Sequence, residues 1–152
     1  MRTWEAHLKG LSGLIQVPTG SGKTYAAVMG PIARMLETAK ERSGVRLLYI
    51  TPLRALSRDL AVALKQPIDA MGWPLRVGIR NGDTASAERT RQIRTPPEIL
   101  ITTPESLCVL LAGRHCEALF NTLETVVLDE WHELIGSKRG IQTELALSWL
   151  RQ

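Results

Sequence analysis

The residues best suited to chemistry lie near the start of the sequence, in a glycine-rich stretch that follows a short apolar run. Residues 14–17 have the character of a buried strand, and Gly20 and Gly22 let the backbone turn so tightly that successive N–H groups point inward. The helix expected next adds the positive end of its dipole, while Lys23 adds a point charge and Thr24 a hydroxyl for a metal ion. The stretch therefore predicts a site for a nucleoside triphosphate with Mg²⁺.

The match to the phosphate-loop pattern G-x-x-x-x-G-K-[ST] is incomplete, because Val17 stands where the first glycine belongs. A glycine turn that caps a helix, in a protein that binds no nucleotide, is the plain alternative. The G-S-G-K-T sequence directly after an apolar run favours the phosphate loop. We expect the stretch to bind the triphosphate through Pro18, Thr19, Gly20, Ser21, Gly22, Lys23 and Thr24.

Two acidic residues, Asp129 and Glu130, follow another apolar run at residues 125–128. Asp129 is placed to hold Mg²⁺, directly or through water, together with Thr24. Glu130 then faces the space beyond the γ-phosphate as the base that orients the attacking water, so that Lys23, Asp129 and Glu130 are the candidate catalytic residues. The alternative is an acidic cap on a following helix.

His132 lies two residues after Glu130, which suggests that it couples the nucleotide to a neighbouring element. An ordinary surface histidine, or one whose hydrogen bonds are satisfied just outside the site, is an equally good interpretation of the same position. Trp4, in a lead-in helix expected within residues 1–12, either packs that helix onto the sheet or stacks on an adenine ring, and packing is favoured.

Strand-type and helix-type patterns alternate along the whole chain. Such alternation, with strands that are continuous apolar runs, predicts an α/β fold: a parallel sheet with helices on both faces. Ligands of these sheets bind beyond the carboxyl ends of the strands, where the polar turns of this sequence fall. The expected strands are residues 14–17, 46–50, 75–80, 98–102 and 125–128, and the expected helices are 23–40 with a kink at Pro31, 55–70, 85–93, 105–111 and 141–151.

Composition is that of one domain with an aliphatic core, since 44% of the 152 residues are hydrophobic and only one is Phe. The net charge is +4, and 14 of the 19 basic residues are Arg, which permits a nucleic-acid partner without proving one. Cys108 and Cys116 have neither a metal spacing nor a disulfide framework, so reduced thiols are expected. No apolar run is long enough for a membrane span, and we expect a cytoplasmic protein.

Four stretches in order, residues 18–24, 51–54, 103–105 and 129–132, resemble motifs I, Ia, Ib and II of a superfamily 2 DExH-box helicase. Residues 80–84, 129–134 and 136–140 narrow the resemblance to the Lhr-type (large helicase-related) family. The similarity is closest to its ligase-associated DEXH-box branch, which is linked to bacterial DNA repair.

The resemblance implies an ATP-dependent motor on single-stranded DNA, with ATP and Mg²⁺ as cofactors and a DNA ligase and a nuclease as candidate repair partners. An RNA helicase of the same superfamily is the alternative, because phosphate contacts do not sense the sugar. Lys138 and Arg139 would add charge near the nucleic acid; the less favoured alternative for residues 136–140 is an ordinary basic turn before the last helix. The residues that would face the tracking strand are Thr51, Pro52, Arg54, Gly82, Asp83, Thr84, Thr103, Pro104 and Glu105.

By this resemblance, residues 1–152 are expected to form the N-terminal RecA-like ATP-binding domain, incomplete at its C-terminus because the sequence stops before motif III. The second RecA-like domain, which carries an arginine that completes the ATP site, is expected to lie outside these residues. Loss of such an arginine costs on the order of 10³ to 10⁵ in turnover. A catalytically incomplete nucleotide-binding fragment is therefore a further alternative.

Overall fold

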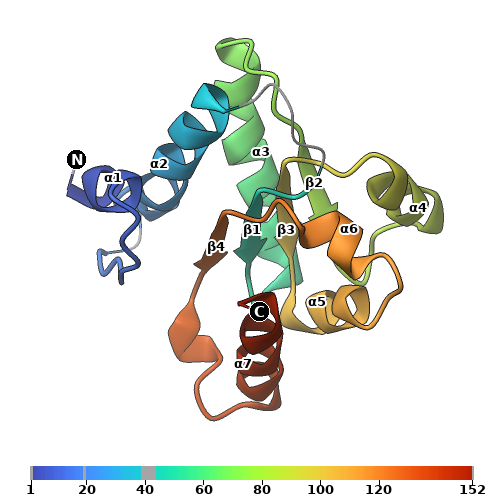
Figure 1. Ribbon diagram of the computed structural model, residues 1–152. Helices are drawn as coiled ribbons and strands as arrows, with labels where there is room; N and C mark the ends of the chain where they lie inside the picture. The colour runs from blue at the N-terminus through green and yellow to red at the C-terminus, as the bar shows by residue number, and fades with distance from the viewer. Residues whose placement is uncertain (1, 19, 39–43, 152) are drawn as a thin grey trace. The chain divides into compact units, whose positions relative to one another are not determined.

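The computed structural model describes residues 2–18, 20–38 and 44–151. The chain divides into two compact units, Met1–Arg42 and Ser43–Gln152 (Figure 1).

The first unit contains two helices, α1 (Arg2–Leu8) and α2 (Lys23–Glu37), which pack against each other. The indole N–H of Trp4 donates to the backbone oxygens of Tyr25 and Ala26, at 3.3 and 3.1 Å. Gly30 of α2 is buried, and a Cβ there would stand 3.4 Å from the His7 side chain. The two hydrogen bonds join Trp4 of the lead-in helix to α2.

The prediction of a strand at residues 14–17 is wrong, because the described residues 11–18 have no regular structure. Leu14 is 84% exposed. A strand persists only where a neighbouring strand pairs with its N–H and C=O groups. The described part of this unit offers helices alone. Helix α2 runs through Pro31, and the predicted helix end near residue 40 lies outside the described residues.

The second unit is built on a parallel four-stranded sheet, as predicted, in the order β2-β3-β1-β4. Leu47 of β1 is in register with Ile99 of β3 and Thr125 of β4, and Val77 of β2 with Ile99. Parallel strands in register end at one common edge, so the turns that follow them are brought together there. The strands are β1 (Leu47–Ile50), β2 (Val77–Arg80), β3 (Ile99–Thr102) and β4 (Thr125–Leu128).

Helices cover both faces of this sheet (Figure 1). Helix α3 (Arg54–Ala70) contacts β2 and β3, and its buried residues include Leu60, Leu64 and Ile68. The opposite face holds a core of Leu48, Ile50 and Leu100 with side chains from α5 (Pro104–Leu111), α6 (Cys116–Phe120) and α7 (Lys138–Leu150). Helix α4 (Ser86–Arg94) connects β2 to β3.

Two short elements of the second unit were not predicted, α6 and the 3₁₀ turn η1 (Trp131–Glu133). Helix α7 begins three residues before its predicted start, because the Ser137 hydroxyl accepts a hydrogen bond from the N–H of Gly140 and caps the helix. Cys108 and Cys116 are both free, as expected. In the described parts of the chain, no helix combines the length and apolarity that a membrane crossing requires.

Candidate nucleotide and nucleic-acid sites

The predicted phosphate loop of the first unit has a backbone suited to an anion. Gly20 and Gly22 have φ of 82° and 81°, the left-handed region that favours glycine. Helix α2 begins at Lys23, and its N-cap residue, Gly22, makes no side-chain cap hydrogen bond. The Ser21 hydroxyl and N–H both donate to the Pro18 oxygen, which closes the turn. Thr19 lies outside the described residues.

The acidic pair of the second unit follows β4 directly, as predicted. Asp129 extends the ladder, because its N–H donates to the Ile50 oxygen at 2.9 Å. Its Oδ2 accepts from the Tyr49 hydroxyl and its Oδ1 from the N–H of Glu130, both at 3.0 Å. The carboxylate is therefore held at both oxygens.

Glu130 is the one non-glycine residue of the described chain with a positive φ, 47°. This left-handed backbone turns the chain sharply between β4 and η1. The Glu130 Oε2 lies 3.5 Å from Nδ1 of His132, whose Nε2 is 3.4 Å from Glu133 Oε1. His132 is thus in direct contact with the candidate base, as a coupling residue would be, while its side chain remains 69% exposed.

The oxygen ligands that the chain offers suit Mg²⁺. This ion is usually bound by one or two carboxylates together with substrate phosphates and water, rather than by a cage of protein ligands. In the second unit Asp129 carries one oriented carboxylate. In the first unit Thr24 lies in the first turn of α2 and carries one hydroxyl. Among the described residues no three or more His, Cys, Asp or Glu side chains form a metal-binding group.

The predicted nucleic-acid residues of the second unit divide by exposure. Thr51, Pro52, Thr103 and Pro104 are buried, which leaves their backbone groups as the candidate contacts. The residues whose side chains are exposed or partly exposed are Arg54, Gly82, Asp83, Thr84, Glu105, Lys138 and Arg139.

The loop after β2 is fastened by side chains from both of its ends. Asn81 Oδ1 accepts from the N–H of Asp83 at 2.9 Å, and the Thr84 hydroxyl accepts from the Asn81 N–H while donating to the Ile79 oxygen. Arg89, on α4, donates to the oxygens of Thr84, Asn81 and Gly82 at 2.7 to 3.3 Å. Residues 81–84 are therefore a rigid surface.

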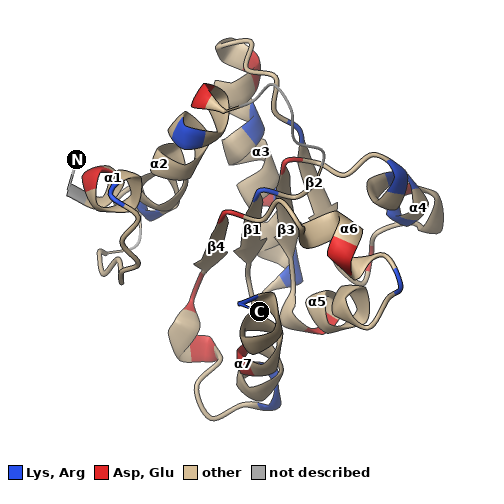
Figure 2. Ribbon diagram, in the orientation of Figure 1, with Lys and Arg blue, Asp and Glu red and all other residues tan. Residues whose placement is uncertain are grey.

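Arg139 joins two of the predicted contact regions. Its guanidinium forms an ion pair with Glu105 and donates to the Pro52 oxygen at 3.3 Å. The pKa of the Glu105 carboxyl lies below its usual range. Burial raises this pKa, but the hydrogen bond from the Glu105 N–H, the charge of Arg139 and the hydrogen bond from the Thr103 hydroxyl together lower it by more. Figure 2 shows basic residues at the start of α7 and on α4.

The turn at residues 136–140 is also a structural feature. Gly136 has a φ of 69°, and a Cβ on Gly140 would collide with the Leu134 oxygen. The turn therefore serves the packing of α7 and at the same time presents Lys138 and Arg139 at the surface.

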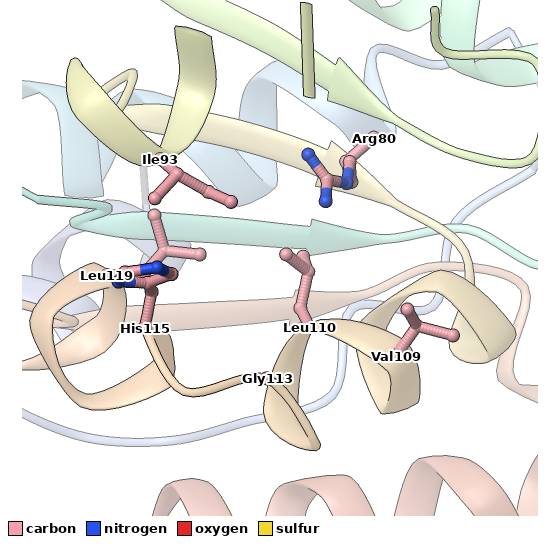
Figure 3. A pocket seen from close by; sticks show the side chains of 7 residues that line it. All are labelled: Arg80, Ile93, Val109, Leu110, Gly113, His115 and Leu119. Carbon is pink, nitrogen blue, oxygen red and sulfur yellow. The ribbon is translucent and has the colours of Figure 1, made fainter. Parts of the chain in front are cut away.

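A cavity of about 70 Å³ lies beside α4, α5 and α6, and its lining is mainly aliphatic (Figure 3). The lining contains none of the predicted site residues; it consists of Arg80, Ile93, Val109, Leu110, Gly113, His115 and Leu119.

Comparison with known proteins identifies the family. The model of the DEAD/DEAH box helicases matches residues 1–152. The chain belongs to the DEAD/DEAH box helicase family. It is 40% identical to the Lhr helicase/uracil glycosylase of Escherichia coli over 98% of this chain and 11% of that protein. It is 36% identical to the ATP-dependent helicase Lhr-Core of Methanothermobacter thermautotrophicus over 94% of this chain and 18% of that protein.

A solved structure agrees with this membership. The Mycobacterium smegmatis helicase Lhr bound to ssDNA and AMP-PNP matches with a TM-score of 0.85 and 36% identity, over 98% of this chain and 20% of that one. The resemblance to Lhr-type helicases and the RecA-like fold are thereby confirmed. The ligase-associated branch stays a prediction. The chain spans less than a quarter of each of these relatives.

Two residues of this helicase domain that were not singled out in the sequence, Tyr49 and Arg89, form hydrogen bonds with predicted site residues. Tyr49 carries the one polar group among the side chains of β1. A hydroxyl in an otherwise apolar strand usually has a hydrogen-bond partner, so the sequence did contain a signal for this contact. Arg89 lies in a polar helix with several other charged residues, so nothing in the sequence distinguished it from a solvated arginine.

Proposed function

We propose that this chain is the ATP-binding motor domain of a helicase that couples ATP hydrolysis to movement along single-stranded DNA. The observation that carries the proposal is the start of α2 at Lys23, preceded by two left-handed glycines. Such a start directs the first N–H groups of the helix and the positive end of its dipole at a phosphate. The related helicase that was solved with AMP-PNP, a triphosphate analogue, supports the same ligand class.

In this proposal each polar residue has one task in hydrolysis. Lys23 and the first N–H groups of α2 bind the β- and γ-phosphates, and Thr24 and Asp129 hold Mg²⁺. Glu130 orients the attacking water and accepts its proton. Bound Mg²⁺ neutralises charge on the phosphates. His132 transmits the state of Glu130 to a neighbouring element, which its 3.5 Å contact with that carboxylate supports.

The nucleic-acid surface in this proposal is the edge formed by the turns after β1, β2 and β3. Arg54, Lys138 and Arg139 meet phosphates through their side chains, and residues 81–84 meet them through a backbone that is already fixed. Phosphate contacts position a strand without recognising its sequence, as a translocating motor requires. The solved relative bound to ssDNA supports a single DNA strand as the substrate.

The wider assignments are proposals that rest on the family. The chain would supply the first RecA-like domain, residues 1–152, and a second one would supply an arginine worth about 10³ to 10⁵ in turnover. We place the protein in the cytoplasm, where ATP and DNA are both available. A role in DNA repair, beside a DNA ligase and a nuclease, follows the ligase-associated resemblance.

The decisive test is ATP turnover by the full-length protein with and without single-stranded DNA. DNA should stimulate ATP turnover by the wild type. Lys23→Ala and Glu130→Gln should each abolish ATP turnover. Lys65→Ala and Glu144→Gln, which change exposed residues of the same types on α3 and α7, should leave it unchanged. Undiminished turnover in Lys23→Ala or Glu130→Gln would contradict the assigned roles. If a matched RNA stimulated turnover more strongly than the DNA, RNA would be the substrate.

A further inference from the structure

Tyr49 combines deep burial with a hydrogen bond to a candidate catalytic residue. It lies in β1, between β3 and β4, and only 1% of its surface is exposed. A phenol hydroxyl in such a place loses its hydrogen bonds to water and needs a protein partner. Its partner is Asp129, at 3.0 Å from the hydroxyl to Oδ2.

The strand register explains why Tyr49 reaches Asp129. Tyr49 is paired with Val127 of β4, and Asp129 lies two residues further along the same chain. Side chains two apart in an extended segment share a face, and a rise of about 3.3 Å per residue puts Asp129 at roughly 7 Å along the strand, the reach of an aromatic side chain. A shorter hydroxyl side chain, that of Ser or Thr, would not span this gap.

The two hydrogen bonds to Asp129 together fix the rotation of its carboxylate. Oδ2 is held by Tyr49 and Oδ1 by the N–H of Glu130, while the N–H of Asp129 is held by Ile50. Without the hydroxyl, Oδ2 loses the hydrogen bond from Tyr49 and the carboxylate is held less firmly in its orientation. A carboxylate oxygen has two lone pairs, so a hydrogen bond from Tyr49 is compatible with a further ligand.

We infer that Tyr49 is a positioning residue for ATP hydrolysis, whose hydroxyl holds the Asp129 carboxylate in the orientation that meets Mg²⁺. The inference rests on the proposed function, in which Asp129 is a ligand of this ion. Loss of a partner that orients a metal ligand costs about 10- to 100-fold in metal affinity or activity.

The experiment measures AMP-PNP binding to the full-length protein by calorimetry, across a series of Mg²⁺ concentrations. Tyr49→Phe keeps the ring and removes the hydroxyl. Without Mg²⁺, the affinity of Tyr49→Phe for AMP-PNP should equal that of the wild type. The Mg²⁺ concentration that gives half of the Mg²⁺-dependent increase in this affinity should be about 10-fold higher in the variant. Thr122→Val is the matched control, because the Thr122 hydroxyl donates to the Val45 oxygen, at the opposite ends of the strands. It should bind as the wild type does.

A double-mutant cycle separates positioning from general stability. If Tyr49 acts through Asp129, then Tyr49→Phe combined with Asp129→Asn should be no more impaired than Asp129→Asn alone. Additive losses, or a fall of Tyr49→Phe binding that is equal with and without Mg²⁺, would mark a folding defect and overturn the inference.

Two further outcomes distinguish this inference from the proposed function. Wild-type behaviour of Tyr49→Phe, with a loss of Mg²⁺ dependence in Asp129→Asn, would overturn the role of Tyr49 and leave the proposed function intact. Wild-type behaviour of Asp129→Asn would overturn both.

Discussion

The guanidinium of Arg54 lies against the backbone of Gly82, where the Cβ of any other residue would stand 2.7 Å from Arg54 Cζ. The ion pair between Arg54 and Asp83 is long, 3.7 Å, and both side chains are more than half exposed, so it contributes little. The close approach therefore depends on the missing side chain at residue 82. Gly82 lets Arg54 lie along the rigid surface of residues 81–84.

We predict that Gly82→Ala moves Arg54 without unfolding the loop. Gly82 is not among the glycines with a positive φ, and the atom that a new Cβ would meet is the end of a flexible side chain. Affinity for single-stranded DNA should fall about as far as in Arg54→Ala, with a salt dependence lower by about 0.7. Fluorescence anisotropy of a labelled oligonucleotide over a salt series measures both quantities.

The control for Gly82→Ala is Arg94→Ala, which removes an exposed arginine of α4 outside the predicted contacts. It should leave the salt dependence as in the wild type. Should Gly82→Ala bind DNA normally while Arg54→Ala does not, the position of Arg54 beside Gly82 would be irrelevant to binding.

Arg89 offers a second prediction, because it fastens residues 81–84 without being a proposed phosphate contact. Arg89→Met keeps most of the stem and removes three hydrogen bonds to backbone oxygens. The backbone N–H groups of residues 82–84 should exchange hydrogen faster, and DNA affinity should fall several-fold with little change in salt dependence. Exchange mass spectrometry and anisotropy measure the two effects.

Arg91→Met is the matched control for Arg89→Met. Arg91 lies on the same helix, and its side chain bonds Glu88 at the surface. It should change neither the exchange of residues 82–84 nor DNA binding. A reduced salt slope in Arg89→Met would instead make Arg89 itself a phosphate contact.

The backbone of Glu130 gives a third prediction, which concerns stability. A non-glycine residue in the left-handed region costs about 1 kcal/mol, and glycine avoids this cost. Glu130→Gly and Glu130→Ala both remove the carboxylate and should both be inactive, but the glycine variant should be more stable by about 1 kcal/mol. Urea denaturation compares the free energies of unfolding, and equal values would show an unstrained backbone.

Local sequence patterns predicted part of the fold and part of the candidate site. The strand-and-turn pattern predicted four of the strands and placed the turns after them on one edge, because continuous apolar runs and polar turns are local signals. Asp129 and Glu130 were predicted for the same reason: they directly follow a strand.

The remaining features depend on contacts between segments far apart in the sequence. Residues 14–17 have the composition of a strand, but pairing decides whether one forms. The bond from Tyr49 to Asp129 spans 80 positions and requires the register of β1 with β4. Nothing in the sequence indicates the left-handed backbone of Glu130, because glutamate rarely adopts this conformation.

Glu98 is the basis of a prediction on pH at the amino end of the sheet, away from the turns of the candidate site. Its carboxylate accepts from the Arg76 side chain at 2.6 and 3.1 Å and from the Arg76 N–H at 2.8 Å, and its side chain is 15% exposed. Burial raises the pKa of Glu98, but these hydrogen bonds and the charge of Arg76 outweigh it, so that the pKa lies below the ordinary 4.5.

A carboxyl whose pKa is lower in the folded state stabilises the fold above its unfolded pKa, and the contribution disappears as the pH falls through the folded value. Glu98→Gln should therefore lower the free energy of unfolding by about 1 kcal/mol at pH 7, discounted for the half-exposed Arg76. As the pH falls through the folded-state pKa and Glu98 becomes protonated, variant and wild type should converge. Urea denaturation over a descending pH series measures the gap, and a gap that stays constant would exclude the ionised pair as its cause.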